Sequence, residues 1–101
     1  MSLQSVVIRF HYGKSDMEPL YELEERIAEA VEESGAGDYD GMEMSMDSEE
    51  GEMSLTGPDA HALLEAISPV LESVRFMRGA EAELRLGPDE DSEAETVVIG
   101  G

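Results

Sequence analysis

The sequence contains no cysteine and no tryptophan, and Lys14 is its only lysine. The absence of cysteine excludes disulfides, thiolate nucleophiles and thiolate metal sites. No apolar run approaches the roughly 18 residues of a membrane span. Nor does the chain show a basic segment followed by an apolar stretch, the pattern of a secretory signal. We therefore expect a protein of the cytoplasm that does not enter a membrane.

Acidic residues dominate the charged residues of the sequence. Six basic residues stand against 25 acidic ones, for a formal net charge of −19. A field of this sign repels phosphate groups and anionic lipid surfaces, so nucleic acids and membranes are poor partners and basic proteins or cations are better ones. The scarcity of lysine beside abundant glutamate fits either adaptation to high salt or the amino-acid bias of a GC-rich genome, and the sequence leaves both open.

The chain is long enough for one domain with one core. Its 101 residues include 41% hydrophobic residues, too many for a disordered composition. We assign residues 1–101 to a single domain, with the core at about 4–87, an acidic loop at 88–95 and a possible edge strand at 96–99.

Hydrophobic periodicity predicts four strands and two helices. Alternation indicates strands at about 5–12, 42–47, 52–56 and 80–86, with a turn at 47–51 closing a hairpin. Apolar residues at helical spacing indicate a helix at about 17–34, ended by Gly35. A second helix is expected to begin at the Thr56-Gly57-Pro58-Asp59 segment and to be kinked at Pro69. This order predicts an α+β fold, the ferredoxin-like βαββαβ sandwich, with two helices on one face of an antiparallel sheet.

The strand pattern also predicts which side chains the helices cover. Four methionines, Met42, Met44, Met46 and Met53, fall on the covered side and are expected in the core. The uncovered face is expected to carry mainly charged and polar residues, which include Arg9, His11, Glu43, Ser45, Asp47, Glu52, Glu81, Glu83 and Arg85. It lacks the aromatics and positive charge that RNA-binding sheets of this kind present, and it is too charged for a dry dimer. We expect a solvated face with cross-strand ion pairs, in a monomer or weak homodimer.

Two acidic clusters invite a functional interpretation. Asp38, Asp40 and Glu43 offer oxygen ligands of the kind that Ca²⁺ and Mg²⁺ prefer, although a solvated hairpin explains the same residues. The predicted first helix carries glutamates along its outer face, among them Glu22, Glu25, Glu29 and Glu32. Like charges four residues apart on a helix repel each other, so this face is suited either to salt or to a positively charged partner.

The residues for catalysis do not form a recognisable set. His11 and His61 are the only histidines, and the sequence pattern places no nucleophile or orienting group beside either one. The glycines at 35–37 lack the flanking pattern of a phosphate-binding loop. We therefore expect no catalysis and no cofactor.

Four short motifs carry a resemblance that covers most of residues 5–99. They are Gly37-Asp38-Tyr39-Asp40-Gly41, Gly57-Pro58-Asp59-Ala60, Pro69-Val70-Leu71 and Leu84-Arg85-Leu86-Gly87-Pro88. With them the chain resembles a family of small, acidic bacterial proteins that has no assigned activity. Turns and helix starts supply most of these motifs, so the resemblance supports the fold and transfers no catalytic residue.

The sequence thus favours a small acidic protein-interaction or regulatory module. Its expected contact surfaces are the glutamate face of the first helix and the open sheet face. A divalent-cation protein or cation-dependent hydrolase that uses the Asp38 and Asp40 region is the alternative from another class. An acidic inhibitor of a basic toxin or nuclease is a further one.

Overall fold

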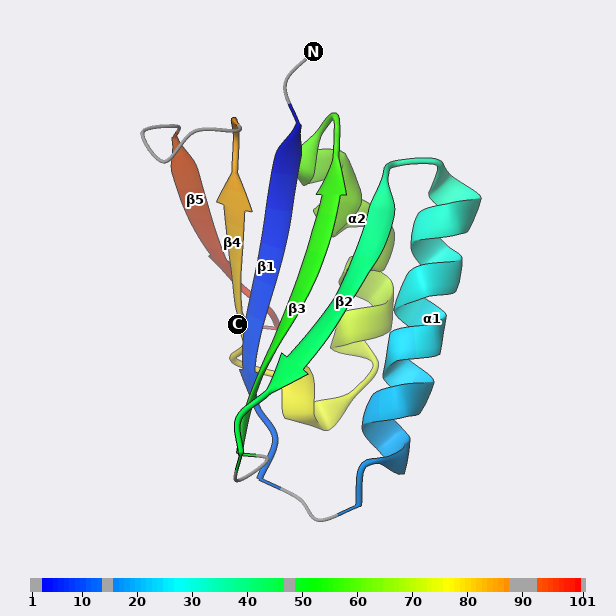
Figure 1. The fold of residues 1–101 in the computed structure, drawn as a ribbon, viewed down its shortest axis with the longest axis vertical. Helices are drawn as coiled ribbons and strands as arrows, with labels where there is room; N and C mark the ends of the chain where they lie inside the picture. The colour runs from blue at the N-terminus through cyan, green and yellow to red at the C-terminus, as the bar shows by residue number, and fades with distance from the viewer. Residues whose placement is uncertain (1–2, 14–15, 47–48, 88–92, 101) are drawn as a thin grey trace.

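In the computed structural model, five antiparallel strands form one sheet and two helices pack on one of its faces (Figure 1). The structure describes residues 3–13, 16–46, 49–87 and 93–100. The elements are β1 (Gln4–His11), α1 (Glu18–Ser34), β2 (Asp38–Met44), β3 (Glu50–Gly57), α2 (Ala60–Glu72), the 3₁₀ turn η1 (Arg75–Met77), β4 (Glu81–Arg85) and β5 (Ala94–Val98). The strand order β2-β3-β1-β4-β5 fits a ferredoxin-like arrangement in its first four strands.

The first helix forms where the sequence predicts it. Its apolar stripe, Leu20, Leu23, Ile27 and Val31, is buried. Gly35 ends the helix with a φ of 67°, a left-handed conformation that glycine adopts without a steric cost. At the start of the helix, the Asp16 side chain accepts a hydrogen bond from the Glu18 N–H at 3.0 Å.

The second helix starts later than the sequence analysis predicts. Thr56 and Gly57 belong to β3, and Asp59 is the capping residue. One carboxylate oxygen of Asp59 accepts hydrogen bonds from the backbone N–H groups of His61 at 3.0 Å and Ala62 at 3.3 Å. Thr56 pairs with Ser5 of β1 in the sheet, so it continues β3 and the helix begins after it.

Strand β2 begins at Asp38, four residues before the predicted start at Met42. Its pairing with β3 shifts register between Tyr39 and Gly41, and Gly41 has a φ of 126°. A bulge of this kind requires a residue without a side chain at the positive φ. The glycine that reads as a turn residue in the sequence therefore lies inside the strand.

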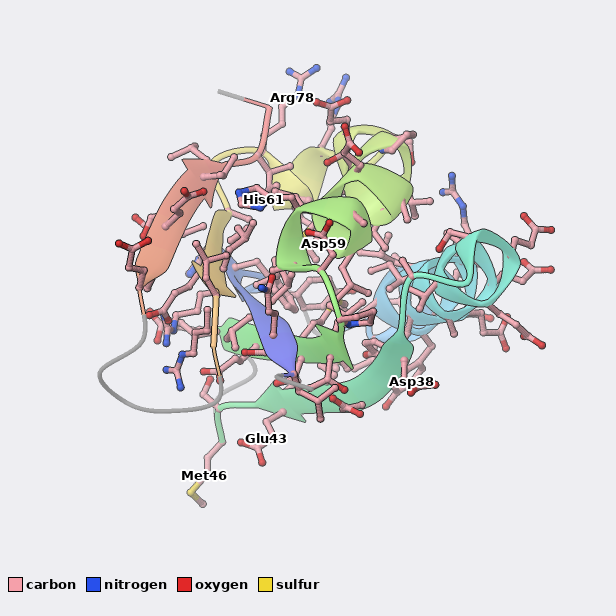
Figure 2. The ribbon with its side chains drawn as sticks, turned by 90° about the horizontal axis from the view of Figure 1, so that it is seen from above. Asp38, Glu43, Met46, Asp59, His61 and Arg78 are labelled. Carbon is pink, nitrogen blue, oxygen red and sulfur yellow. The ribbon has the colours of Figure 1, made fainter. Side chains whose placement is uncertain are left out.

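The prediction that Met46 is a core residue is wrong. Strand β2 ends at Met44, and backbone pairing of Ser45 with Glu50 closes the hairpin. Met46 follows in the turn and is fully exposed, projecting away from the molecule in Figure 2. Met53 is buried, and Met42 and Met44 are half-buried against the core. Ser45, predicted on the open face, follows the end of β2 and is exposed, and Asp47 is outside the described residues.

The C-terminal segment also differs from its prediction. Ala94 and Glu95, assigned from the sequence to the acidic loop 88–95, belong to β5, which pairs with β4. Residues 88–92 lie outside the described part of the chain. The turn η1 was not predicted, and it places Met77 in the core.

The end of the sheet near η1 is closed by aromatic rings. Phe76 packs against Phe10 with ring centroids 6.2 Å apart and against Tyr12 at 5.1 Å. Gly51 lies opposite Phe10 in the sheet, and the Phe10 ring occupies the space that a side chain there would need.

Candidate interaction surfaces

The outer face of α1 is an uninterrupted acidic surface. Six glutamates are exposed along it, namely Glu18, Glu22, Glu25, Glu29, Glu32 and Glu33. Arg26 is the only basic residue of the helix, and within the described part of the chain no ion pair joins it to these glutamates. Figure 2 shows oxygen-bearing side chains spreading outward from this helix. The four glutamates of α1 singled out from the sequence therefore lie together on one solvent-facing surface.

An aromatic side chain lies inside this acidic surface. Tyr21 is 54% exposed, one of the few large hydrophobic residues that the protein leaves in solvent. It precedes Glu25 by one helical turn, so the two side chains are neighbours on the helix face. Sequence reasoning did not select Tyr21. Helical periodicity could have identified it, because a tyrosine outside the apolar stripe of an amphipathic helix does not face the core.

Strand β2 extends the acidic surface and is fixed to α1 by one hydrogen bond. The hydroxyl of Tyr39 donates to the Glu24 carboxylate at 2.7 Å. Partial burial, followed by this bond and the negative charge of Glu24, raises the pKa of Tyr39 far above its usual value. Tyr39 therefore stays protonated and keeps donating. Asp38 and Asp40 flank it and are exposed.

The three residues considered as metal ligands do not converge. Asp38 faces Thr56 and Glu43 faces Glu52, so four residues of β3 separate them, about 13 Å. Figure 2 shows Asp38 and Glu43 well apart. Asp40 is the extra residue of the bulge between Tyr39 and Gly41. Among the described residues, no group of three potential ligands lies close enough to hold a metal ion.

Ion pairs cross the open face of the sheet, centred on Arg9 of β1. Its guanidinium contacts Glu83 of β4 at 3.1 Å and Glu52 of β3 at 3.7 Å. Arg85 approaches the same oxygen of Glu83 at 3.7 Å. That oxygen is buried and makes no well-aligned hydrogen bond with any described residue, so charge alone holds it. The cross-strand pairs expected from the sequence are present.

His11 does not join this network. It is exposed, next to a recess of about 820 Å³ at the end of the sheet where β1 ends and β4 begins. The recess is lined by both charge signs, including Arg75, Arg78, Glu50 and Glu81. Figure 2 shows Arg78 and Glu43, which both border it, on opposite sides of the molecule.

The other histidine has two acidic neighbours. The ring of His61 at the start of α2 lies 2.7 Å from a carboxylate oxygen of Glu95 in β5 and 3.9 Å from Asp59. This contact joins the start of α2 to β5, whose residues stay exposed. The sequence could not reveal it, because it joins residues 34 positions apart.

Comparison with known proteins adds information on the fold. No family model and no curated protein matches the chain. Among solved structures, the chain is similar to Rv0793 from Mycobacterium tuberculosis, with a TM-score of 0.63 and 20% sequence identity over 90% of this chain and 100% of that one. At this identity the likeness concerns the fold alone. Within the described ranges, neither helix is long and apolar enough to cross a membrane.

Proposed function

We propose that this protein is a ferredoxin-like domain with an added edge strand that acts, without catalysis, as an acidic protein-interaction module. Its contact surface is the outer face of α1, and its partner is a basic protein. The resemblance to a family of small acidic bacterial proteins belongs to the same proposal. The observation that carries it is the exposed Tyr21 among the glutamates of α1.

A tyrosine that is more than half exposed contributes little to the core, whereas tyrosine at a protein interface is enriched and is often among the residues that dominate the binding energy. The carboxylates one turn away, at Glu18 and Glu25, favour arginine or lysine on the partner, and an arginine placed over the tyrosine ring gains a further cation–π attraction. The acidic surface would also accelerate association with a basic partner at low salt.

The rigidity of the surface supports the same function. Helix α1 is fixed beneath by Leu20, Leu23, Ile27 and Val31, and at its side by the bond between Tyr39 and Glu24. A preformed surface loses little conformational entropy when it binds. The divalent-cation alternative gains no support from the separation of Asp38 and Glu43. The inhibitor alternative is a special case of the proposal in which the basic partner is a toxin or nuclease.

The test is capture of a partner from extract of the source organism by the immobilised protein, with three variants. The first carries Glu22→Lys, Glu25→Lys and Glu29→Lys. The matched control carries Glu65→Lys, Glu72→Lys and Glu81→Lys, an equal charge change on exposed positions away from α1. The third is Tyr21→Ala, which leaves the charge unchanged.

A basic protein retained by the wild type and the control, and lost by the α1 and Tyr21 variants, is the expected result. Equal loss in both charge variants with no effect of Tyr21→Ala would show that only net charge matters and would refute a site on α1. A captured partner without excess positive charge would also contradict the proposal. Circular dichroism confirms that each variant is folded before it is compared.

A further inference from the structure

The two edges of the sheet differ in how they meet solvent. At one edge, β2 carries a bulge and the acidic residues Asp38, Asp40 and Glu43, features with which proteins prevent another strand from pairing. At the other edge, all five residues of β5 are exposed. Figure 1 shows β5 at the side of the sheet away from α1, and no described element lies beyond it.

Within the described ranges, the backbone of β5 presents a row of hydrogen-bonding groups that no other strand uses. At its ends, the Leu86 N–H donates to the Glu93 carbonyl and the Ile99 N–H donates to the Ala80 carbonyl, both at 2.8 Å. Residues of an antiparallel strand direct both backbone groups alternately to one neighbour and then to the other. Since 93 and 99 face β4, residues Ala94, Thr96 and Val98 direct their N–H and C=O groups away from it.

The side chains of β5 are unusually apolar for the surface of this chain. Val97 is 38% exposed and Val98 is 51% exposed. Glu95, the only charged residue of the strand, already lies 2.7 Å from His61. An edge with exposed valines, free backbone groups and one paired charge is a template for another strand.

We propose that β5 pairs antiparallel with β5 of a second copy of this chain, centred on Thr96, to give a two-fold dimer with a continuous sheet. In this register Thr96 lies opposite Thr96 of the second copy and Ala94 lies opposite Val98. The outward groups of the three residues then form about six backbone hydrogen bonds. Glu95 lies opposite Val97, so no like charges face each other directly.

Charge complementarity at the ends of the strands favours a second copy of the chain as the partner of β5. Arg78 lies beside Gly100, just past the end of β5, where a Cβ on Gly100 would be 3.5 Å from the Arg78 side chain. Arg78 is exposed and forms no ion pair with a described residue. The antiparallel register brings the end of one β5 to the beginning of the other, where Glu93 is exposed. Each copy therefore offers an arginine to a glutamate of the other, and the two-fold symmetry closes the assembly at two chains.

The dimer surface is separate from α1, so the two proposals can fail independently, and salt affects them in opposite directions. Two chains of net charge −19 repel each other, and raising KCl from about 0.1 to 1 M shortens the screening length from about 10 to 3 Å. Dimerisation through β5 should strengthen with salt, whereas binding of a basic protein to α1 should weaken.

The first experiment is sedimentation equilibrium of the purified protein at 1 M KCl, compared with Thr96→Pro and Thr96→Lys. Proline removes an N–H that points away from β4, so the fold tolerates it, and lysine on an edge opposes pairing. We expect a dimer for the wild type and at least a tenfold weaker association for both variants. Asp40→Asn on the opposite edge changes the net charge as Thr96→Lys does, and it should leave the dimer intact.

The second experiment tests the register. Because the chain has no cysteine, Thr96→Cys introduces one thiol on the two-fold axis, and oxidation in air should link two copies. Val98→Cys should not link to itself, since two such residues would lie about 13 Å apart. A wild type that stays monomeric at millimolar concentration and 1 M KCl would overturn the proposal. So would a dimer that both Thr96 variants retain, or cross-linking of Val98→Cys in preference to Thr96→Cys.

Discussion

Gly51 is the position where the packing of this fold predicts the largest effect of the smallest substitution. It is buried in β3, and a Cβ there would lie 2.4 Å from Cζ of Phe10 and 2.6 Å from the sulfur of Met44. The Met44 side chain is flexible and half-buried, so it can move. The Phe10 ring is held against Phe76 with centroids 6.2 Å apart, so it cannot move without disturbing a second ring.

Overpacking of this kind costs about 1–3 kcal/mol, and the better strand preference of alanine returns up to about 1 kcal/mol. For Gly51→Ala we expect the free energy of unfolding to fall by about 1–2 kcal/mol, which lowers the thermal midpoint of a domain of this size by about 4–16 °C. Urea unfolding at fixed salt measures it. The control is Glu50→Ala, an exposed neighbour expected to change stability by less than about 0.5 kcal/mol.

A second substitution separates steric conflict from other causes. Phe10→Leu shortens the side chain that the new methyl group would meet. Combined with Gly51→Ala it should cost less than the sum of the two single changes, and a double-mutant cycle gives the coupling. If Gly51→Ala matched the wild type in stability, or if the two changes were additive, the close packing of Phe10 over Gly51 would be refuted.

Three further outcomes follow from local contacts. Asp59→Ala should destabilise the protein by about 1 kcal/mol in urea unfolding, whereas Asp59→Ser should retain most of the stability, because serine also accepts at a helix start; equal loss in both would contradict the capping role. Because its pKa is raised on folding, Tyr39 contributes to the stability of the protein fully below the unfolded pKa of about 10, and this contribution declines as the pH rises above that value. The pKa of Tyr12 is also raised, so its contribution to stability declines in the same direction. Tyr39→Phe should therefore flatten the loss of stability between about pH 10 and 11, and an unchanged slope would count against it. Three pairs of like charges four apart on α1 each cost about 0.2–0.5 kcal/mol at low salt, so 1 M KCl should raise the thermal midpoint by about 2–12 °C, and a midpoint that falls with salt would refute the repulsion.

Periodicity was enough to place most of the regular structure. The buried stripe of α1 and the alternation of β1 are each long and strongly patterned, so α1 begins within one residue of its predicted start and β1 keeps its predicted burial. The predicted boundaries that were wrong lie where a polar residue can take either of two structural roles. Thr56 can cap a helix or pair in a strand, and its neighbours on both sides, Ser5 of β1 and Asp38 of β2, decide for the strand.

The errors in β2 and β5 have the same origin. Gly41 reads as a turn because glycine is common in turns, but here it occupies a bulge at φ 126°. Met46 continues the alternation of Met42 and Met44, yet the hairpin has already closed at Ser45. Alternation shows which face a residue would take and does not show where the partner strand stops.

The interaction surfaces also differ in how far local sequence patterns predict them. The glutamates of α1 were predictable, because helical periodicity alone places them opposite the buried stripe. A possible edge strand at 96–99 was predicted as well, but its start at Ala94 was not, because that start depends on pairing with β4. Likewise, the contact of His61 with Glu95 joins residues 34 positions apart, which local sequence patterns do not relate.

The most direct test of the central claim, that the protein binds a basic partner through α1, is the dissociation constant of the captured partner for wild type and Tyr21→Ala, measured at about 0.1 and 1 M KCl. We predict that Tyr21→Ala weakens binding by at least about tenfold at both salt concentrations, as an aromatic anchor requires, and that salt weakens the wild-type complex. An affinity that neither Tyr21→Ala nor salt changes would contradict the account.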